Sequence, residues 1–555
     1  MTNRPLYQDL TDQGKWQYLY GNETETKPFY ERNNHVINSD MNCYYQDLVE
    51  MTPDKFRSWV IEMRKTVKES WDLYGCPPRI GKSEDALIEQ FNKMAEFPIH
   101  EFTHTDELSD TEDDVIINKS RVGGEADQWF SNMMMTRINY TEKDTGYSIY
   151  DLFAQDRFAE RMIKASMRHF RRDSLYEHAK SALCNDDKYS VVNVSNGEEW
   201  MDAFHNNPKI FKGYDFMLEQ TKMREGVNSG YYQVQQSDIL HLTREQVKEY
   251  KENGWLVYRN HSTFDIDKMP DNMIYNIRVY KKDKKVFPRG FASFRIGYIQ
   301  VAVNFPSMTA KYLYERFTDD IRHQDRIVIY DPSAGWGGRI LGAMACRDDR
   351  SIHYVGTDPN PDNFNDDVSS SQYEHLADFY NTKTYRGNPI FSETNTYRIF
   401  QECAEEIHLN PDFQGYKGKI DLIFTSPPYF NREAYSEDPS QSYKKFGSSY
   451  KAWKEGFLRP TLETCVEYLR SGRYLLWNVA DLLINKKKYL PLQQDSMDIL
   501  ESLGMEYQYT LKMAMELMPG QNRLDKDGIP MCKNYCRVDG KYLKYEPVLV
   551  FKKPA

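Results

Sequence analysis

The stretch that decides the fold is Ile327-Val-Ile-Tyr-Asp-Pro-Ser-Ala-Gly-Trp-Gly-Gly338. Its first four residues are apolar, which is typical of a strand buried on both faces of a parallel sheet. Gly335, Gly337 and Gly338 permit a tight turn and a close approach of a ligand to the backbone. The next segment, 339–345, favours a helix whose N-terminal amides face the turn. This order predicts a binding element for a nucleotide-like ligand.

A second strand is expected at 353–356, and it leads to Asp358. Asp358 follows Gly335 by 23 residues, close to the spacing of roughly 20 at which an acid at the end of strand two meets ribose hydroxyls. A dinucleotide enzyme would carry G-x-G-x-x-G, whereas the glycines here read G-x-G-G after Asp331-Pro. The acid therefore favours a cationic, adenosine-bearing ligand without a pyrophosphate. A turn with a purely structural role is the alternative.

A second informative stretch is Thr425-Ser-Pro-Pro-Tyr429, which follows an apolar run at 420–424. Ser426 lies 91 residues beyond Gly335. A strand–helix–strand unit takes roughly 30 residues, so this distance holds about three crossovers. Ser426 is therefore expected at the C-terminal end of strand four, beside strand one, and the two turns should face one cleft.

The composition of this second turn predicts its chemistry. Consecutive prolines fix the backbone and remove two N–H donors. Oxygen atoms around Ser426 and Pro427 could accept N–H bonds from the exocyclic amine of a nucleobase, a poor nucleophile, while Tyr429 offers a face for an extruded base. The turn contains no cysteine nucleophile, so catalysis would rest on positioning. Alone, a Pro-Pro-Tyr turn is also a common surface element.

Composition excludes several classes of protein. Charged residues make up 28% of the 555 residues and hydrophobic residues 40%, as in a soluble globular protein of two to four domains. No apolar run is long enough for a membrane span, and the start lacks an apolar signal core, so a cytoplasmic location is expected. The net charge of −11 argues against a protein that coats nucleic acid broadly. It leaves room for a local basic cleft.

Two other motifs carry weak signals. Cys532 and Cys536 form a lone C-x3-C without a second pair or nearby histidines, so reduced thiols are favoured over a zinc site and no metal is expected. The segment 75–83 has five residues between its glycines, where a phosphate loop needs four, and its two prolines remove N–H donors.

The N-terminal half gives only local signals. We expect a mostly helical region at 1–115 and a mixed region at 116–290 that could recognise the target. Helices 52–72 and 83–96 could form a helix–turn–helix-like pair. The individual expectations are helices at 52–72, 83–96 and 150–185 and one beginning near Thr243, a solvated acidic loop at 104–114, and strands at 275–281 and 291–303.

At its two turns the chain resembles the S-adenosylmethionine-dependent amino-methyltransferases of DNA. The glycine turn is similar to that family's Asp-Pro-Phe-x-Gly-x-Gly, and the proline turn to its [Asp/Asn/Ser]-Pro-Pro-[Tyr/Phe]. The segment 304–314 looks like the helix and loop that close over the methionine end of the cofactor. The resemblance implies S-adenosylmethionine as cofactor, with contacts from Phe305, Thr309, Asp331, Ser333, Ala334, Gly335, Gly337, Asp358 and, by a weaker match, Asn388. It implies Ser426, Pro427, Pro428 and Tyr429 as the catalytic residues.

The resemblance covers roughly 300–555 and implies an α/β fold, with a C-terminal Rossmann-like doubly wound methyltransferase sheet in a domain at 291–555. Residues 474–479 fit strand five, and 507–513 with 548–551 fit the final hairpin. Ser426 is similar to the cytosine-N4 enzymes, whereas the cofactor-first motif order differs from many members with this turn. The base therefore stays open between cytosine N4 and adenine N6. Ser333 and Trp336 set the chain apart, as in a phage or mobile-element branch.

DNA is the expected partner. Basic and aromatic residues at 430–435 and 443–446 could form a loop that contacts the strand, and the Lys/Arg-rich insert at 521–544 could reach DNA. The alternative for the loop is a polar segment with packed aromatics. The alternative functions are methylation of RNA or of a protein amide, and cofactor binding without catalysis.

Overall fold

The computed structural model contains two compact units. One holds the described residues between 68 and 152 and those from 302 to 555, and the other holds the described residues of 43–67 and 153–287. The structure describes residues 43–44, 53–74, 84–109, 115–120, 122, 124–138, 146–159, 239–242, 244–252, 255–259, 275–281, 285–287, 302–324, 326–346, 350–365, 370–384, 395–447, 449–484, 488–515, 529–530 and 532–555.

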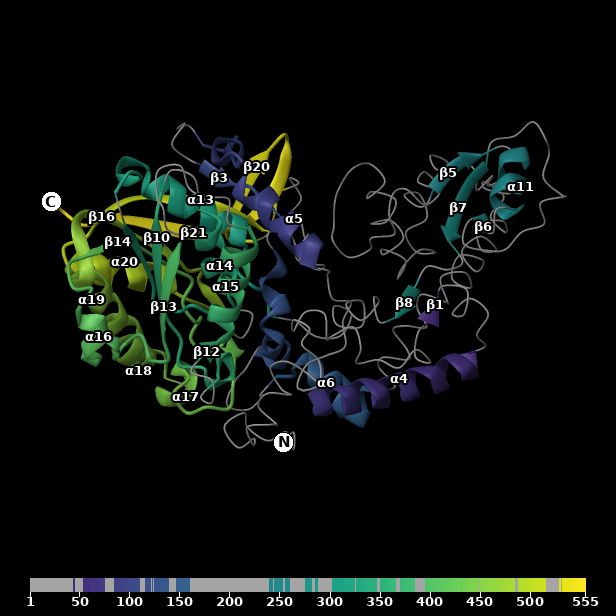
Figure 1. Ribbon diagram of the computed structural model, residues 1–555, viewed down its shortest axis with the longest axis horizontal. Coiled ribbons are helices and arrows are strands. Elements are labelled where there is room, and N and C mark those ends of the chain that lie inside the picture. Colours follow the sequence, from purple (N-terminus) through teal and green to yellow (C-terminus); the bar gives the residue numbers. More distant parts are fainter. Residues whose placement is uncertain are drawn as a thin grey trace. The chain divides into compact units, whose positions relative to one another are not determined.

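Ten of the described strands form one mixed sheet in the larger unit (Figure 1). Its parallel part has the order β13-β10-β9-β14-β16, and antiparallel β21 and β19 follow. In chain order this is a 3-2-1-4-5-7-6 sheet, so the predicted doubly wound fold is confirmed. The strands are β9 (Ile327–Asp331), β10 (Ile352–Thr357), β13 (Thr396–Phe400), β14 (Ile420–Thr425), β16 (Leu469–Asn478), β19 (Glu506–Met515) and β21 (Lys541–Lys552).

The strand order reverses at β9, which pairs with both β10 and β14. Asp331 pairs with Gly356, and Tyr330 pairs with Ile423. The carboxyl ends of these three strands therefore lie at one edge, where doubly wound sheets bind ligands. The prediction that Ser426 follows strand four beside strand one is confirmed.

Both faces of β9 and β14 are buried, which explains their apolar runs. Side chains alternate between faces along a strand. In β9, Ile327 and Ile329 join one core cluster, whereas Val328 and Tyr330 join the other. The same alternation continues in β14.

Two groups of helices cover the sheet, and Figure 1 shows them on opposite sides of the strands. Buried side chains of α5, α13, α14 and α15 belong to the first core cluster, and those of α16, α18, α19 and α20 to the second. The bounds are α5 (Glu84–Ala95), α13 (Ser307–Phe317), α14 (Gly338–Met344), α15 (Gln372–Thr384), α16 (Pro411–Gln414), α17 (Ser442–Lys445), α18 (Tyr450–Trp453), α19 (Arg459–Tyr468) and α20 (Leu492–Ser502).

Residues before 160 contribute to this same sheet. β3 (Val115–Ile117) pairs in parallel with β19, and β2 (Thr103–Thr105) pairs with β3. Asp106 is buried and its carboxylate lies 2.5 Å from Lys512 Nζ. The expectation of a solvated acidic loop at 104–114 is therefore wrong for its first residues. The domain boundary expected at 115 falls inside β3.

The remaining described strands of this unit are short; among them β20 pairs with β21 of the main sheet, and β4 pairs with β15. They are β4 (Arg137–Ile138), β11 (Phe364–Asn365), β12 (Ser370–Ser371), β15 (Glu433–Ala434), β17 (Leu482–Ile484), β18 (Lys488–Leu490) and β20 (Tyr535–Val538), and a short helix, α6 (Ile149–Ala154), lies where the helix at 150–185 was expected.

The smaller unit contains a three-stranded antiparallel sheet of order β5-β7-β6 with helix α11 beside it. The helix expected near Thr243 and the strand at 275–281 are confirmed, as are the helices at 52–72 and 83–96. The remainder of the helix expected at 150–185, from 160 onward, and 291–301 lie outside the described residues. None of the described helices is long and apolar enough to span a membrane. The bounds are α4 (Pro53–Tyr74), β1 (Cys43–Tyr44), β5 (Ile239–Leu242), α11 (Arg244–Glu252), β6 (Trp255–Arg259), β7 (Tyr275–Lys281) and β8 (Lys285–Phe287).

Candidate active site

The carboxylate of Asp331, fully buried at the end of β9, joins the two turns. Its Oδ1 accepts hydrogen bonds from the Ser333 backbone N–H (3.2 Å) and from the Thr425 hydroxyl (2.7 Å). Its Oδ2 accepts from Arg339 Nε and from the Tyr354 hydroxyl, both at 2.6 Å. Four donors satisfy this charge, as a buried carboxylate requires. Asp331 therefore links the glycine turn (331–338) to the proline turn (425–429).

The glycine turn depends on backbone that only glycine adopts at low cost. Gly335 and Gly337 have φ values of +63° and +77°. A Cβ at Gly337 would clash with the ring of Phe130, and one at Gly338 would clash with the Phe305 carbonyl. At Gly335 the nearest atom would be Arg339 Nη2 at 3.5 Å, an ordinary contact. Close packing thus surrounds the end of the turn, while Gly335 leaves space for a ligand.

Arg339 stabilises the glycine turn through its contacts with Asp331 and Ser333. The buried guanidinium forms an ion pair with Asp331 and also donates to the Ser333 carbonyl. Burial by itself would lower the pKa of Arg339, but the Asp331 carboxylate raises it above its usual value. The guanidinium also lies 5.6 Å from the centre of the Phe305 ring. This cation is committed to the protein, so the turn offers no free arginine to a pyrophosphate.

The predicted cofactor contacts before and within this turn differ in exposure. Phe305 is half-buried and its ring meets Phe424 edge-on, with 5.2 Å between centroids. Thr309 and Ala334 are buried, whereas Ser333 is half-buried. The structure brings all of these residues to the carboxyl edge or to the helix that packs against it, and Asn388 lies outside the described residues.

Asp358 lies one residue beyond β10 and is 8% exposed. Its Oδ2 accepts from the Tyr373 hydroxyl (2.7 Å) and Asn363 Nδ2 (3.1 Å), and its Oδ1 from the Asn360 backbone N–H (2.8 Å). Burial raises the pKa of Asp358 to about 6, although these hydrogen bonds oppose the rise. Tyr373 also donates to the Gly335 carbonyl, so one phenol joins the acid to the glycine turn.

A segment from the first 160 residues completes this side of the site. Asn132 donates from Nδ2 to Asn363 Oδ1 at 2.6 Å, and both residues are buried. Met133 and Ile138 form a small core cluster against which Trp336 of the glycine turn packs. The bulky residue at 336 is therefore explained by a neighbour that is distant in sequence.

The proline turn lies directly beyond β14. Thr425 and Pro427 are buried, whereas Ser426, Pro428 and Tyr429 are partly exposed. The Tyr429 hydroxyl donates to Glu546 Oε1 on β21, and burial raises the pKa of Tyr429 well above its usual value. The structure thus brings the four predicted catalytic residues beside the glycine turn.

Phe430 closes the proline turn in a conformation that is uncommon for a bulky residue. Its φ is +48°, and its backbone N–H donates to the Pro428 carbonyl at 3.1 Å. Its buried ring packs against Tyr450 and Trp453, with centroid distances of 5.5 and 5.8 Å. Such strain persists where surrounding packing fixes it, and it often marks a functional site.

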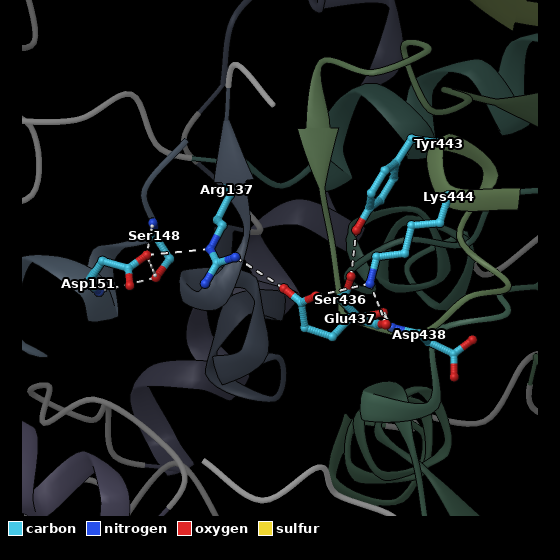
Figure 2. A network of polar contacts seen from close by, with 8 residues as sticks. All are labelled: Arg137, Ser148, Asp151, Ser436, Glu437, Asp438, Tyr443 and Lys444. Carbon is cyan, nitrogen blue, oxygen red and sulfur yellow. Dashed lines mark hydrogen bonds and ion pairs between the residues drawn. The ribbon is translucent and has the colours of Figure 1, made fainter. Parts of the chain in front are cut away.

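The loop after the proline turn is held by the segment around β4, as Figure 2 shows. β15 pairs with β4 in antiparallel fashion. Arg137 lies 3.5 Å from Asp151 and 3.1 Å from Glu437, and Glu437 also lies 3.0 Å from Lys444. This chain of charges ties the loop to a part of the molecule some 300 residues earlier in the sequence.

Several basic and aromatic side chains of this loop are engaged within the molecule, and contact of the loop with DNA stays a prediction. Tyr443 is buried and donates to the Ser436 carbonyl (2.6 Å, Figure 2), and Phe446 packs on the second core cluster. Lys445 pairs with Glu405 and with Glu406, at 3.0 and 2.7 Å. These contacts fit the alternative, a polar loop with packed aromatics.

Two basic residues of the insert at 521–544 are engaged in ion pairs. Its described residues form β20 and the first part of β21, Lys533 pairs with Asp481, and Arg537 Nε lies 3.3 Å from Glu107. Residues 521–528 lie outside the described part. Cys536 is buried in β20, and the described residues contain no cluster of acids, histidines and cysteines that could hold a metal.

Sequence reasoning missed several residues of the site: Phe130, Asn132, Asn363, Tyr373 and Glu546. Each acts through a tertiary contact, and none belongs to either turn. A weak signal existed for Tyr373, since it lies 15 residues beyond Asp358 on the helix that follows strand two.

Comparisons with known proteins add little. No family model and no curated protein matches the chain. Among solved structures, a candidate DNA modification methylase from Thermus thermophilus is 18% identical, covering 27% of this chain and 50% of that one, with a TM-score of 0.18. A candidate RNA methyltransferase from Pyrococcus horikoshii is 12% identical, covering 45% and 81%, with a TM-score of 0.23. An O-methyltransferase from Thermotoga maritima is 11% identical, covering 52% and 77%, with a TM-score of 0.22.

The chain thus spans about half the length of the Thermus protein, one structure of which contains S-adenosyl-L-methionine. At these identities and scores we draw no argument on function from the likeness.

Proposed function

We propose that the protein is an S-adenosylmethionine-dependent methyltransferase that methylates an exocyclic amine of a DNA base, with cytosine N4 favoured over adenine N6. The observation that carries this proposal is the 2.7 Å hydrogen bond from the Thr425 hydroxyl to Asp331. It holds the glycine turn and the proline turn side by side at the switch point of the sheet, where a ligand of one can meet a ligand of the other.

The residues of the glycine side fit the cofactor. The Asp358 carboxylate can accept hydrogen bonds from ribose hydroxyls, and the space beside Gly335 admits a ligand against the backbone. Because Arg339 is committed to Asp331, no described cation of the turn is available for a pyrophosphate. The anionic site instead suits a sulfonium. When bound, S-adenosylmethionine supplies an electrophilic methyl group.

The proline side would hold and orient the amine. Pro427 and Pro428 lack N–H groups, so the turn presents acceptors without competing backbone donors. The Ser426 oxygen and nearby carbonyls could accept the amine N–H bonds, while Tyr429 offers its ring to a flipped base. Positioning of the amine for in-line attack is the main source of rate enhancement in this scheme.

The favoured base follows from Ser426. Ser426 is the residue before the two prolines, where related turns carry Asp, Asn or Ser. Serine at this position resembles the cytosine-N4 enzymes. The three functional alternatives, methylation of RNA, methylation of a protein amide, and binding without catalysis, use the same fold and are outcomes of the test below.

The test supplies the full-length protein with methyl-labelled cofactor and separate pools of DNA, RNA and protein. We expect label in DNA, recovered after digestion as an N-methylated nucleoside, with N4-methylcytosine ahead of N6-methyladenine. Label in RNA or protein alone would contradict the DNA assignment. Cofactor binding with no transfer to any pool would contradict the assignment as an enzyme.

A further inference from the structure

The amine that is methylated must lose a proton, and the proline turn carries no acid or base to take it. Besides the phenol of Tyr429, its polar side chains are the hydroxyls of Thr425 and Ser426, which are far too weak as bases to retain a proton near neutral pH. A carboxylate in contact with the turn would solve this problem, since a general base contributes typically 10²–10⁴-fold to such reactions.

β21 brings such a carboxylate to the turn. Asn478, the last residue of β16, pairs with Val548, and β21 runs antiparallel to β16. Asn478 Nδ2 also donates to the Pro547 carbonyl at 3.0 Å. Residue 546 therefore lies just past the carboxyl end of β16, at the edge of the sheet where the two turns meet.

Glu546 contacts the turn through one oxygen. Its Oε1 accepts the hydrogen bond from the Tyr429 hydroxyl, whereas Oε2 accepts no hydrogen bond from the described part of the chain. Ser426 stands three residues before Tyr429 in the same turn, and its side chain opposes the rise in the pKa of this phenol. Three oxygen atoms thus follow one another from the position expected for the amine to a carboxylate on β21.

We propose that Ser426, Tyr429 and Glu546 form a proton relay that ends on the Glu546 carboxylate. The proposal rests on the proposed function, because it needs an amine bound at Ser426. It adds to that function a proton acceptor from a strand 117 residues away in sequence from the proline turn.

The relay balances the methyl transfer. The lone pair of the amine nitrogen forms the N–CH₃ bond, and the electrons of the S–CH₃ bond pass to sulfur, which becomes a neutral thioether. One N–H bond then breaks with its electrons retained by nitrogen. That proton passes to the Ser426 oxygen, the Ser426 proton passes to the Tyr429 oxygen, and the Tyr429 proton passes to Glu546.

The surroundings of Glu546 favour the protonated form of its carboxyl group. Burial raises the pKa of Glu546, opposed by the hydrogen bond from Tyr429 and by the charge of Lys544. Glu433 accepts a 2.6 Å hydrogen bond from Tyr435, and burial raises its pKa, to which the charge of Glu546 adds. Two partly buried acids thus disfavour charge on each other.

The decisive variant is Glu546→Gln in the full-length protein. The amide oxygen can still accept the Tyr429 hydrogen bond, but it cannot take up a proton. We expect kcat at saturating cofactor to fall about a hundredfold, within the range for loss of a general base, with little change in KM for DNA. The kcat of the wild type should increase as pH rises and Glu546 loses its proton. The kcat of the variant should not show this increase.

Two further variants separate a relay from mere positioning. Tyr429→Phe keeps the ring and cuts the relay, so it should lower kcat similarly, and the double variant should be no worse than either single one. Asp378→Asn is the matched control: Asp378 accepts a 2.7 Å hydrogen bond from Tyr397, which lies on β13, three strands from β14. This control should keep wild-type activity.

The outcomes are distinct. A Glu546→Gln enzyme within twofold of wild type, with its pH limb intact, would overturn the relay and leave the proposed function standing. A wild-type protein that binds cofactor but methylates no nucleic acid would overturn the proposed function, and the relay with it.

Discussion

The glycine turn and the proline turn leave neighbouring strands but meet opposite physical demands. The glycine turn needs backbone freedom, since Gly335 and Gly337 adopt left-handed φ values. The proline turn needs restraint, which Pro427 and Pro428 impose, and it ends on a strained Phe430. The comparison shows that a site for two ligands can combine a glycine-rich turn of unusual backbone conformation with a rigid proline turn. The buried Asp331 carboxylate joins the two.

The two turns also differ in what satisfies their polar groups. On the glycine side, Asp358 is held by Tyr373 and Asn363 from the segment that follows it. On the proline side, Tyr429 is held by Glu546 from the final hairpin. The hydrogen bond from Tyr373 to Asp358 joins residues 15 apart in sequence, whereas that from Tyr429 to Glu546 joins residues 117 apart. Variants that alter the glycine turn or the proline turn alone test whether the two turns act separately.

The largest effect is expected from Tyr429→Ala. Loss of the ring removes the stacking face for the base and should lower methyl transfer at least about a hundredfold, as misplacement of a reacting group does. Cofactor affinity should stay within about threefold of wild type, since the Tyr429 hydroxyl bonds to Glu546 on β21 and its ring packs on the second core cluster. Label transfer and calorimetric titration measure the two quantities. Retained transfer would contradict the catalytic role of this turn.

Gly337→Ala should destabilise the glycine turn. The new Cβ adds a left-handed penalty of about 1–2 kcal/mol and overpacking against Phe130 of about 1–3 kcal/mol. Gly418→Ala is the matched control, because Gly418 has a φ of +66° and no atom within 4 Å of an added Cβ. Chemical denaturation should show the larger loss for Gly337→Ala, together with weaker cofactor binding. Equal losses would show that Phe130 does not pack there.

Thr425→Val should loosen the link between the turns. It removes one of four hydrogen bonds to the buried Asp331 carboxylate, which should lower the free energy of unfolding by about 1.5–3 kcal/mol. Thr461→Val is the control, since the buried Thr461 hydroxyl has no hydrogen-bond partner among the described residues. That change should be neutral or stabilising. Similar losses in both variants would indicate a packing effect instead.

Cofactor affinity should depend on the charge of Asp358. Its pKa of about 6 means that the carboxylate ionises as pH rises through 6, and the ionised form accepts ribose hydrogen bonds. Affinity should therefore increase from pH 5 to pH 7, by up to about tenfold, the change expected one pH unit below the pKa. Titration calorimetry across this range measures it, and Asp358→Asn should flatten the profile.

The sequence predicts the parallel sheet well for a physical reason. Strands buried on both faces are continuous apolar runs, and the glycine and proline turns mark where β9 and β14 end. Crossover length then places strand four beside strand one. The three-residue strands β2 and β3 are too short to show a periodicity, so their place in the same sheet could not be foreseen.

Within the site, the sequence predicts the residues of the two turns but not their partners. The bond between Thr425 and Asp331 spans 94 residues, and that between Asn132 and Asn363 spans 231. Such pairs depend on tertiary packing and leave no local pattern. The same holds for Lys444, whose charge in the sequence suggests DNA but whose partner in the structure is Glu437.

The smallest effect is expected from Glu437→Gln. The ion pair with Arg137 is 3.1 Å long, but the Glu437 side chain is 62% exposed, and such pairs contribute less than about 1 kcal/mol. Unfolding free energy should change by less than this amount, and transfer should stay within about twofold of wild type. A large loss of transfer at unchanged stability would reveal that the β4–β15 contact positions the catalytic loop.

The central claim is that the joined turns methylate an exocyclic base amine in DNA. The most direct measurement is to produce the protein in a methylation-deficient bacterium and to sequence the DNA by a method that distinguishes N4-methylcytosine from N6-methyladenine. We expect a methylated amine within a short recurrent sequence, absent when Tyr429→Ala is produced instead. Unmodified DNA in cells that contain folded, cofactor-binding protein would contradict the claim.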